Sequence, residues 1–477
     1  MKKILMCAVA VAASFSVMAQ NEHIHVFRSD AEKVTSVKGS EIQSITHEGS
    51  VATGFQAMKI TKNNGDVTTI DMAVIDSVQT RLTNLPVFYV NLQDYPNWTE
   101  LQGAKDDKHP ATLRMDGNGM YDDLPEQTVE FRGRGNSTWS MPKKPYRAKM
   151  DKKASVCGLP KDKSFVLLAN HIDCTLMRNA VAFWVANWFE MPYSNHAVPV
   201  RVIFNGIDKG AYLLTEKIGI GGGSVDIDEN TGMLFELDSN YDEDYKFRYN
   251  KNGFNLPVMV KDPDITDIDL PEGYTVDSYF QAWKNDFSAM LDVVTAGNPD
   301  ADLSKYIDLE SMANFFVVQS VANNHEVKHP KSFYIHKKAL GQDEVYHFGP
   351  VWDFDWAYSY DGYEGAAANI PLVENSGDST GWKFVQYLFK NKAFRTLYKQ
   401  KWDKFVNEGY PQLKVYMEEY ANLIEPQAIA NGKIWGADSG RGTKSTLEFR
   451  KNFNDLKNWI ETRINYCNSH ANYGIHN

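Results

Sequence analysis

Two carboxylates stand two positions apart in the sequence GPVWDFDWAYS, which begins at Gly349. They are Asp353 and Asp355, and aromatic residues alternate with them. In an extended segment, the rings would anchor the core while both carboxylates face the opposite side together. Like charges this close are unfavourable unless a proton or a cation lies between them. The pattern therefore predicts a divalent cation with hard oxygen ligands, most often magnesium, although backbone N–H groups or an arginine would serve a purely structural pair.

A polar loop, residues 323–332, lies between a predicted helix and a predicted strand at 333–336. Loops in such positions often carry catalytic groups. Glu326 could accept the proton of an attacking hydroxyl, and Lys331 could neutralise a transferred phosphoryl group. A solvated connector would have the same composition, so the loop alone leaves both interpretations open.

Glycines and small polar residues form a third candidate region, RGRGNSTWSMPKKPYRAKM, at residues 132–150. Its first part contains Gly133, Gly135, Asn136 and Ser137. Glycine adopts backbone conformations that other residues avoid, and a turn of this kind leaves its backbone N–H groups free. The sequence therefore predicts a tight loop that can hold an anion.

The last part of that region, YRAKM, alternates as a strand does. Arg147 and Lys149 then point to one face, and the apolar side chains point to the other. Two cations on one face beside a glycine-rich loop predict a phosphate-binding surface. A solvated strand face would have the same pattern, so this stretch alone does not separate the two.

These groups must be positioned by two kinds of structure. Short alternating or apolar runs predict a β-rich first half, and from about residue 270 apolar residues recur at helical spacing. A β-rich half and a helical half predict two lobes, with ligands in the cleft between them. The predicted helices span residues 175–189, 278–295, 308–321, 381–392, 393–407, 412–431 and 446–468, and the predicted strands include 85–90, 128–131, 199–204, 210–218 and 233–237.

The N-terminus, MKKILMCAVAVAASFSVMAQ, has two lysines, an apolar run and a small residue, Ala19, at a suitable cleavage point. This pattern predicts a secretory signal peptide over residues 1–19, so we expect an exported protein of the periplasm, cell surface or exterior. Its removal takes away two lysines and no acids, which changes the formal net charge from −11 to −13. No later apolar stretch approaches the length of a membrane span, so no transmembrane segment is expected.

The composition of the 477 residues, 43% hydrophobic and 23% charged, is that of an ordinary globular chain. Its acidic balance argues against a nucleic-acid backbone as a partner. After the signal peptide, the cysteines are Cys157, Cys174 and Cys467, an odd number that does not predict a disulfide framework. We expect buried free thiols, with one disulfide between Cys157 and Cys174 as the alternative. Neither a CxxC nor an HExxH motif is present to predict zinc.

Taken in order, these stretches resemble the spore coat protein H (CotH) kinase-like family. Several ordered motifs carry the resemblance across most of residues 85–477, and residues 20–84 lie outside it. The motifs are RGRGNSTW at 132–139, KPYRAK at 144–149, LAN at 168–170 with Arg178-Asn179 after it, GAYLLTE at 210–216 and GPVWDFDWA at 349–357.

The resemblance implies an α+β fold like that of an atypical protein kinase, with two lobes. After the signal peptide, a small β-rich module would occupy residues 20–84. The kinase-like domain would span residues 85–477, with a β-rich N-lobe of about 85–237 and a helical C-lobe of about 238–477.

The resemblance further implies ATP and magnesium or manganese between the lobes, and phosphoryl transfer to protein serines. Asp353 would take the metal-binding place of the aspartate in the DFG motif of ordinary kinases, with Asp355 and Ser332 as further metal ligands. Glu326, Lys331 and Asn324 would be the catalytic residues. The nucleotide-binding residues would be Arg134, Gly135, Asn136, Ser137, Arg147, Lys149 and Glu216.

The catalytic loop departs from the pattern of many family members, which have an aspartate there and a Lys-Asn pair after it. This chain has Asn324-His325-Glu326 and then Lys331-Ser332. Glutamate reaches one methylene further than aspartate, and serine is a weaker metal ligand than an amide oxygen. A displacement of about 1 Å can cost ~10²-fold in rate.

Three functions therefore stay open. The first is a kinase that modifies exported proteins with accessible hydroxyls. The second is a weakly active or inactive kinase-like protein that binds a component of the envelope or cell surface. The third is an enzyme that attaches nucleotides to proteins, because a pair of metal-binding carboxylates would serve that reaction equally well.

Overall fold

The structure is a computed structural model of the whole chain. The residues that it describes are 23–28, 35–50, 53–81, 85–251, 253–359, 367–372, 380–436 and 445–470. The predicted signal peptide, residues 1–19, lies outside the described residues.

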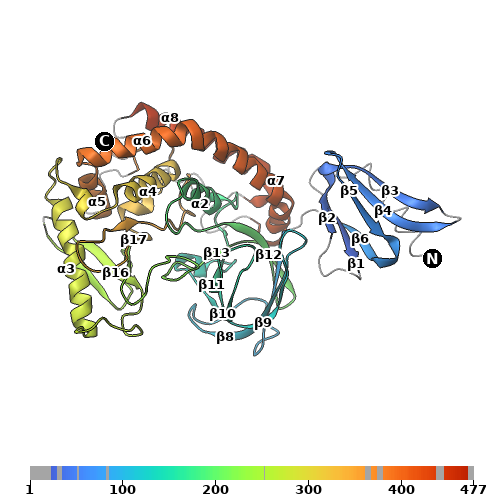
Figure 1. The fold of residues 1–477 in the computed structure, drawn as a ribbon, viewed down its shortest axis with the longest axis horizontal. Helices are drawn as coiled ribbons and strands as arrows, with labels where there is room; N and C mark the ends of the chain where they lie inside the picture. Colours follow the sequence, from blue (N-terminus) through green and yellow to red (C-terminus); the bar gives the residue numbers. More distant parts are fainter. Residues whose placement is uncertain are drawn as a thin grey trace.

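Residues 23–81 fold into two three-stranded antiparallel sheets, in the orders β2-β1-β6 and β3-β4-β5 (Figure 1). A turn at residues 63–66 joins β4 to β5, and Lys62 N donates to Asp66 O at 2.8 Å. A small apolar cluster that includes Val26, Met58 and Ile60 lies within this module. The strands are β1 His23–Arg28, β2 Thr35–Lys38, β3 Ile42–Ser50, β4 Gly54–Lys62, β5 Val67–Asp71 and β6 Ile75–Arg81.

Seven strands then close into a barrel, in the order β10-β11-β13-β12-β7-β8-β9. Every neighbouring pair is antiparallel except β12 and β7, which run parallel. The sequence predicted a β-rich region but neither its closure nor the strands β8 and β11. The strands are β7 Val87–Leu92, β8 His109–Asp116, β9 Leu124–Gly133, β10 Tyr146–Ala154, β11 Asp162–Leu168, β12 Val198–Phe204 and β13 Ile207–Glu216.

A second sheet, in the order β15-β16-β14-β17-β18, stands beside the barrel among the helices (Figure 1). The α+β class is therefore as predicted. The second half of the chain is not simply a helical lobe, because the four strands β15 to β18 fall within it. The elements are α2 Arg178–Trp188, β14 Met233–Leu237, β15 Lys246–Tyr249, β16 Leu256–Asp262, α3 Val276–Thr295, α4 Leu309–Ala322, β17 Phe333–Lys337, β18 His347–Phe348, α5 Thr380–Leu388, α6 Lys392–Lys404, α7 Tyr410–Trp435 and α8 Phe449–Ser469.

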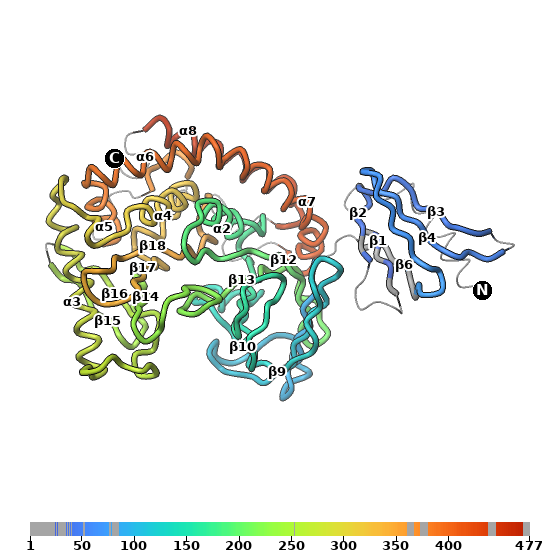
Figure 2. Tube along the Cα trace, viewed as in Figure 1, coloured from blue at the N-terminus to red at the C-terminus, as the bar shows by residue number. Residues whose placement is uncertain are grey.

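The two last helices, α7 and α8, pass over α2 and α4 and reach back to the barrel (Figure 2). A π-helical turn, Phe405–Gly409, joins α6 to α7. Among the described residues, none of the helices combines the length and the apolar character that crossing a membrane would require.

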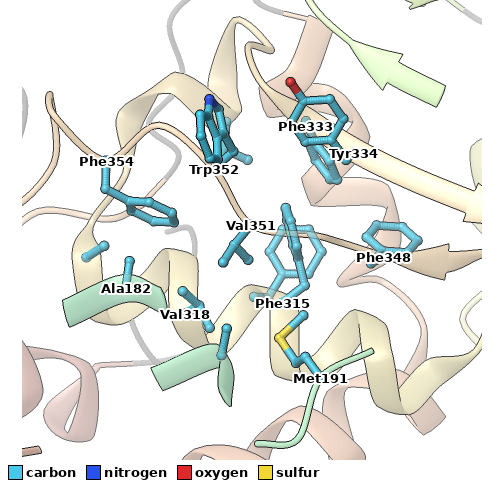
Figure 3. Close-up of a cluster of buried hydrophobic side chains, with 14 of the residues drawn as sticks. Ala182, Met191, Phe315, Val318, Phe333, Tyr334, Phe348, Val351, Trp352 and Phe354 are labelled. Carbon is cyan, nitrogen blue, oxygen red and sulfur yellow. The ribbon is translucent and has the colours of Figure 1, made fainter. Parts of the chain in front are cut away.

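Helix α4 is the centre of the largest core. The side chain of Asp308 caps it by accepting from Ser311 N at 2.6 Å, and Asn323 ends it in a left-handed conformation with φ of 44°. Phe315 of α4 stacks on Phe333 of β17 at 4.7 Å between ring centroids. Figure 3 shows these rings together with Val351, so the core fixes the start of both candidate segments, 323–332 and 349–359.

The three cysteines Cys157, Cys174 and Cys467 are all free and buried. The alternative of a disulfide between Cys157 and Cys174 is therefore wrong. Each thiol behaves as a small apolar side chain in the core, which is the common role of a buried free cysteine.

Candidate functional site

A cavity of about 650 Å³ opens between the barrel and the second sheet. Its walls come from the loop after β9, from β10 and β11, from the start of α2, from β14 and β16, and from the segments at 326–334 and 352–356. Ten of the predicted site residues line it. They are Arg134, Gly135, Asn136, Ser137, Arg147, Glu326, Lys331, Ser332, Asp353 and Asp355.

Three predicted residues do not line the cavity. Lys149 is exposed on β10 and lies beyond the edge of the cavity, although it is on the same strand face as Arg147. Glu216 is buried and holds His196, whose backbone N donates to Glu216 Oε2 at 2.9 Å. The side-chain hydrogen bond that Glu216 accepts from His196 also raises the pKa of His196, although burial opposes this shift. Asn324 accepts from Glu326 N at 3.3 Å and so shapes the turn that presents Glu326.

The segment that carries the two aspartates is not extended. Asp353 has a φ of 65°, in the left-handed region, so the strict alternation of faces is lost. The prediction that the tryptophans lie opposite the carboxylates is therefore wrong, because Trp352 and Trp356 also line the cavity. Only Phe354, which is fully buried, points wholly into the core (Figure 3).

Asn179, at the start of α2, holds this turned segment in place. Its Nδ2 donates to Asp355 Oδ1 at 2.5 Å, and its Oδ1 accepts from Phe354 N at 2.9 Å. The helix is itself fixed by Asp173, whose Oδ2 accepts from Arg178 N at 2.9 Å. One buried amide therefore orients the carboxylate of Asp355 and determines the path of the backbone beside it. The sequence analysis placed Asn179 in one of the motifs of the family resemblance but assigned no role to its side chain.

The acids of the cavity repel one another. Burial first, and then the charge of Asp353, raise the pKa of Glu326 to about 8. Burial and the same neighbour raise the pKa of Asp355 to about 7, against the opposing hydrogen bond from Asn179. Burial also raises the pKa of Asp353, and nearby Arg134 and Lys331 oppose that shift. These carboxyl groups therefore tend to keep protons near neutral pH, unless a cation balances their negative charge.

Cations face these acids across the cavity. Arg134 lies over the ring of Trp352, with its guanidinium carbon 5.2 Å from the ring centroid. Arg147 donates to Ser164 Oγ at 3.1 Å, and its pKa is lowered by burial and then by neighbouring Arg132. Arg134 and Arg147 therefore present positive charge on the barrel wall, where phosphate oxygens would be favoured.

Sequence reasoning missed a second cationic group, which comes from strands far apart in the chain. Lys261 of β16 bridges Glu236 at 2.9 Å and Glu243 at 2.7 Å. Lys217, just after β13, lies 3.8 Å from Asp262. The two lysines lie on separate segments that are remote in sequence. No local sequence pattern therefore indicates that they line the same cavity.

The cavity is nearly balanced in charge, since eight Asp or Glu side chains and seven Lys or Arg side chains line it. A simple anion site would be dominated by cations. A nearly balanced site instead suits a ligand that itself carries both signs, such as a polyphosphate with a divalent cation.

The carboxylates of the cavity suit a magnesium ion that takes few ligands from the protein. Among the described residues, no group of three or more His, Cys, Asp or Glu side chains is placed to hold a metal ion. Magnesium seldom needs such a cage, because one or two carboxylates, substrate phosphates and water complete its octahedron. Asp353 and Asp355, which face the cations of one cavity, fit that smaller role.

Comparison with protein-family profiles identifies the family of the chain. The sequence profile of the family described as CotH kinase protein matches residues 130–467, which is most of the chain. A comparison with curated proteins found no match. The matched range contains every residue of the cavity except those of the loop at 105–106. The chain therefore belongs to the CotH kinase family.

Proposed function

We propose that this protein is an exported, two-lobed kinase-like enzyme that binds ATP with magnesium or manganese and transfers phosphate to serine hydroxyls of proteins. The observation that carries the proposal is one cavity in which the carboxylates Asp353 and Asp355 face Arg134, Arg147 and Lys331. Family membership supports the proposed kinase-like reaction, and the predicted signal peptide supports the proposed export.

The phosphates would lie against the loop at residues 134–138. Gly135 has a φ of 78°, and a Cβ there would run into the side chain of Thr138, so glycine is required for this path. Backbone N–H groups, Arg134 and Lys331 would then share the negative charge of the triphosphate. A divalent cation would supply positive charge against the negative charge that develops on the phosphate oxygens. Asp353 and Asp355 are the carboxylates that would hold it.

Glu326 would accept the proton of the serine hydroxyl as the oxygen attacks the γ-phosphorus. The new P–O bond forms while the bond to the β-phosphate oxygen breaks, and ADP leaves. A carboxyl with a pKa of about 8 still holds its own proton at neutral pH. A divalent cation held by Asp353 would offset the repulsion that helps to raise this pKa, so the cation would favour the ionised form of Glu326, which is the form that acts as a base.

Thermal unfolding of residues 20–477 tests the nucleotide site. With ATP and manganese or magnesium, we expect stabilisation of about 2.7 kcal/mol at 100 times the dissociation constant. Asp353→Ala should lose the metal-dependent part of this shift. The exposed acid Asp267 gives the matched control, and Asp267→Ala should keep the shift. An absence of any shift in the unmodified protein would reject the nucleotide site and favour a binding protein without catalysis.

Mass spectrometry of protein substrates then separates the reactions. Phosphate on serine supports the kinase, whereas a nucleoside monophosphate on the substrate would replace it with nucleotide transfer. Glu326→Gln should keep nucleotide binding and lose transfer, because the amide cannot accept the hydroxyl proton.

A further inference from the structure

A fully buried lysine lies at the end of the loop that covers the cavity. Lys143 Nζ donates to the carbonyl of Ala211 on β13 and to Asn431 Oδ1 on α7, the latter at 2.9 Å. It also lies 4.5 Å from the centroid of the Tyr212 ring. Lys143 therefore joins three parts of the fold that are remote in sequence: the loop, the barrel and the last turns of α7.

This arrangement is costly to build. Burial lowers the pKa of Lys143 to about 7, which is the effect expected when an ammonium group leaves water. An apolar side chain would fill the same volume without that cost. Around it the space is closed, because a Cβ at Gly210 would lie 2.5 Å from Asn431 Oδ1. The same oxygen accepts from Ala211 N at 3.2 Å, so the amide of Asn431 is held from two sides.

Hydrogen bonds of the residues next to Lys143 link it to the wall of the cavity. Lys144, the next residue, donates from Nζ to Trp139 O at 2.7 Å, and its own carbonyl accepts from Tyr212 Oη at 3.0 Å. Arg134 N donates to Pro145 O at 3.3 Å and closes the base of the loop. The residues between Arg134 and Pro145 are therefore tied at both ends, and both end residues line the cavity.

We propose that Lys143 is a positioning residue: its bond to Asn431 makes the order of the loop at residues 134–138 depend on the docking of the C-terminal turns of α7. The effect on ligand affinity rests on the proposed nucleotide site. The effect on loop order does not, and it can be measured without a ligand.

The test uses the chain from residue 20 with four substitutions. Lys143→Met removes the donor at similar size, and Asn431→Leu removes the acceptor. Asn431→Asp keeps an acceptor oxygen at the same place and should rescue the link. Lys433→Met changes an exposed lysine on the same helix and is the matched control.

Two readouts are compared at a temperature at which all variants are folded. The first is hydrogen exchange of backbone amides at residues 134–142 without ligand, with α4 as the internal reference. The second is calorimetric affinity for ATP with manganese. For Lys143→Met and Asn431→Leu we expect faster exchange in the loop but not in α4, and an affinity about 2- to 30-fold weaker. Asn431→Asp and Lys433→Met should match the unmodified protein.

Equal exchange rates in the loop for all variants would overturn the proposal. A parallel rise of the exchange rates in the loop and in α4 would also overturn it, because Lys143 would then only stabilise the whole fold. If Lys143→Met fails to fold, the contrast between Asn431→Leu and Asn431→Asp decides. If the unmodified protein binds no nucleotide, the proposed function is rejected. The exchange data would still test whether the Lys143–Asn431 bond orders the loop.

Discussion

The carboxyl groups of Glu326, Asp353 and Asp355 share one physical situation. The pKa of each is raised, first because burial removes the carboxylate from water and then because a neighbouring acid repels its charge. The protein tolerates this because Asn179 donates to Asp355 and because Arg134 and Lys331 lie near Asp353. The ligand-free site is therefore under electrostatic strain that protons relieve at low pH and a bound cation would relieve at high pH.

This strain predicts a pH dependence of stability that Glu326→Gln should reduce. The pKa of Glu326 rises from 4.5 in its ordinary state to about 8 in the folded protein. Between those values the folded state binds more protons than the unfolded state, so the free energy of unfolding falls as pH rises. For one proton the slope is at most about 1.4 kcal/mol per pH unit. Urea unfolding of the ligand-free protein from about pH 5 to about pH 8 measures it.

Glu419→Gln on the exposed face of α7 is the control for this measurement. It should leave the slope of the unmodified protein unchanged. Equal slopes for Glu326→Gln and the unmodified protein would show that the carboxyl of Glu326 titrates as it does in water.

At the scale of elements, the turn that presents Glu326 is set by the helix packed against it. The turn is a short 3₁₀ helix, His325–Lys328, and α5 lies close to it. Gly381 of α5 makes this approach possible, because a Cβ there would lie 2.7 Å from Lys328 O and would collide with Val327 O as well. The backbone of the turn, not a flexible side chain, therefore meets α5.

Gly381→Ala is expected to destabilise the protein and to weaken any function of Glu326. Alanine favours a helix over glycine by up to ~1 kcal/mol, whereas forcing atoms into a packed site costs roughly 1–3 kcal/mol. The collision should win because backbone atoms must move. Urea unfolding gives the difference, and Gly222→Ala, whose Cβ would meet only Asp226 at 3.9 Å, should be near neutral. A more stable Gly381→Ala protein would contradict the close approach.

The same scale shows what local sequence can and cannot predict. The helical periodicity at residues 308–321 matches α4, Leu309–Ala322, because an apolar run with an Asp cap is a local signal. Strand β11 was missed because SFVLLA is a continuous apolar run without alternation, although its alternate residues face two different cores. The backbone turn at Asp353 depends on Asn179, which is remote in sequence, so no local pattern reveals it.

In the whole molecule, strand β11 packs against two cores, one among the helices and one inside the barrel. Val166 and Leu168 of β11 pack with the helices, whereas Phe165 and Leu167 of the same strand pack inside the barrel. The walls of the cavity are therefore joined through one strand. Among the described residues, the apolar cluster of the N-terminal module runs from Ile24 to Val78 and includes none from the barrel or the helices, so its packing is separate.

This separation predicts that residues 85–477 fold and bind ligands without the N-terminal module. The truncated chain should keep the thermal shift with ATP and manganese, because none of the module's described residues lines the cavity. Differential scanning calorimetry of the longer chain, from residue 20, should resolve two transitions, and the truncation should remove one of them. A module of about 60 residues buries little surface and should unfold first. Loss of solubility or of the main transition on truncation would contradict the prediction.

The reactivity of one buried thiol, Cys467, reports local opening of the protein. Cys467 on α8 lies 3.8 Å from Ser320 Oγ on α4, and burial raises the pKa of its thiol. Only the thiolate reacts readily with alkylating reagents or oxidants, so this sulfur is protected while the helices stay together. The rate at which Cys467 is modified then measures how often α8 separates from α4. In an oxidising compartment, oxidation of this thiol would likewise require the two helices to separate.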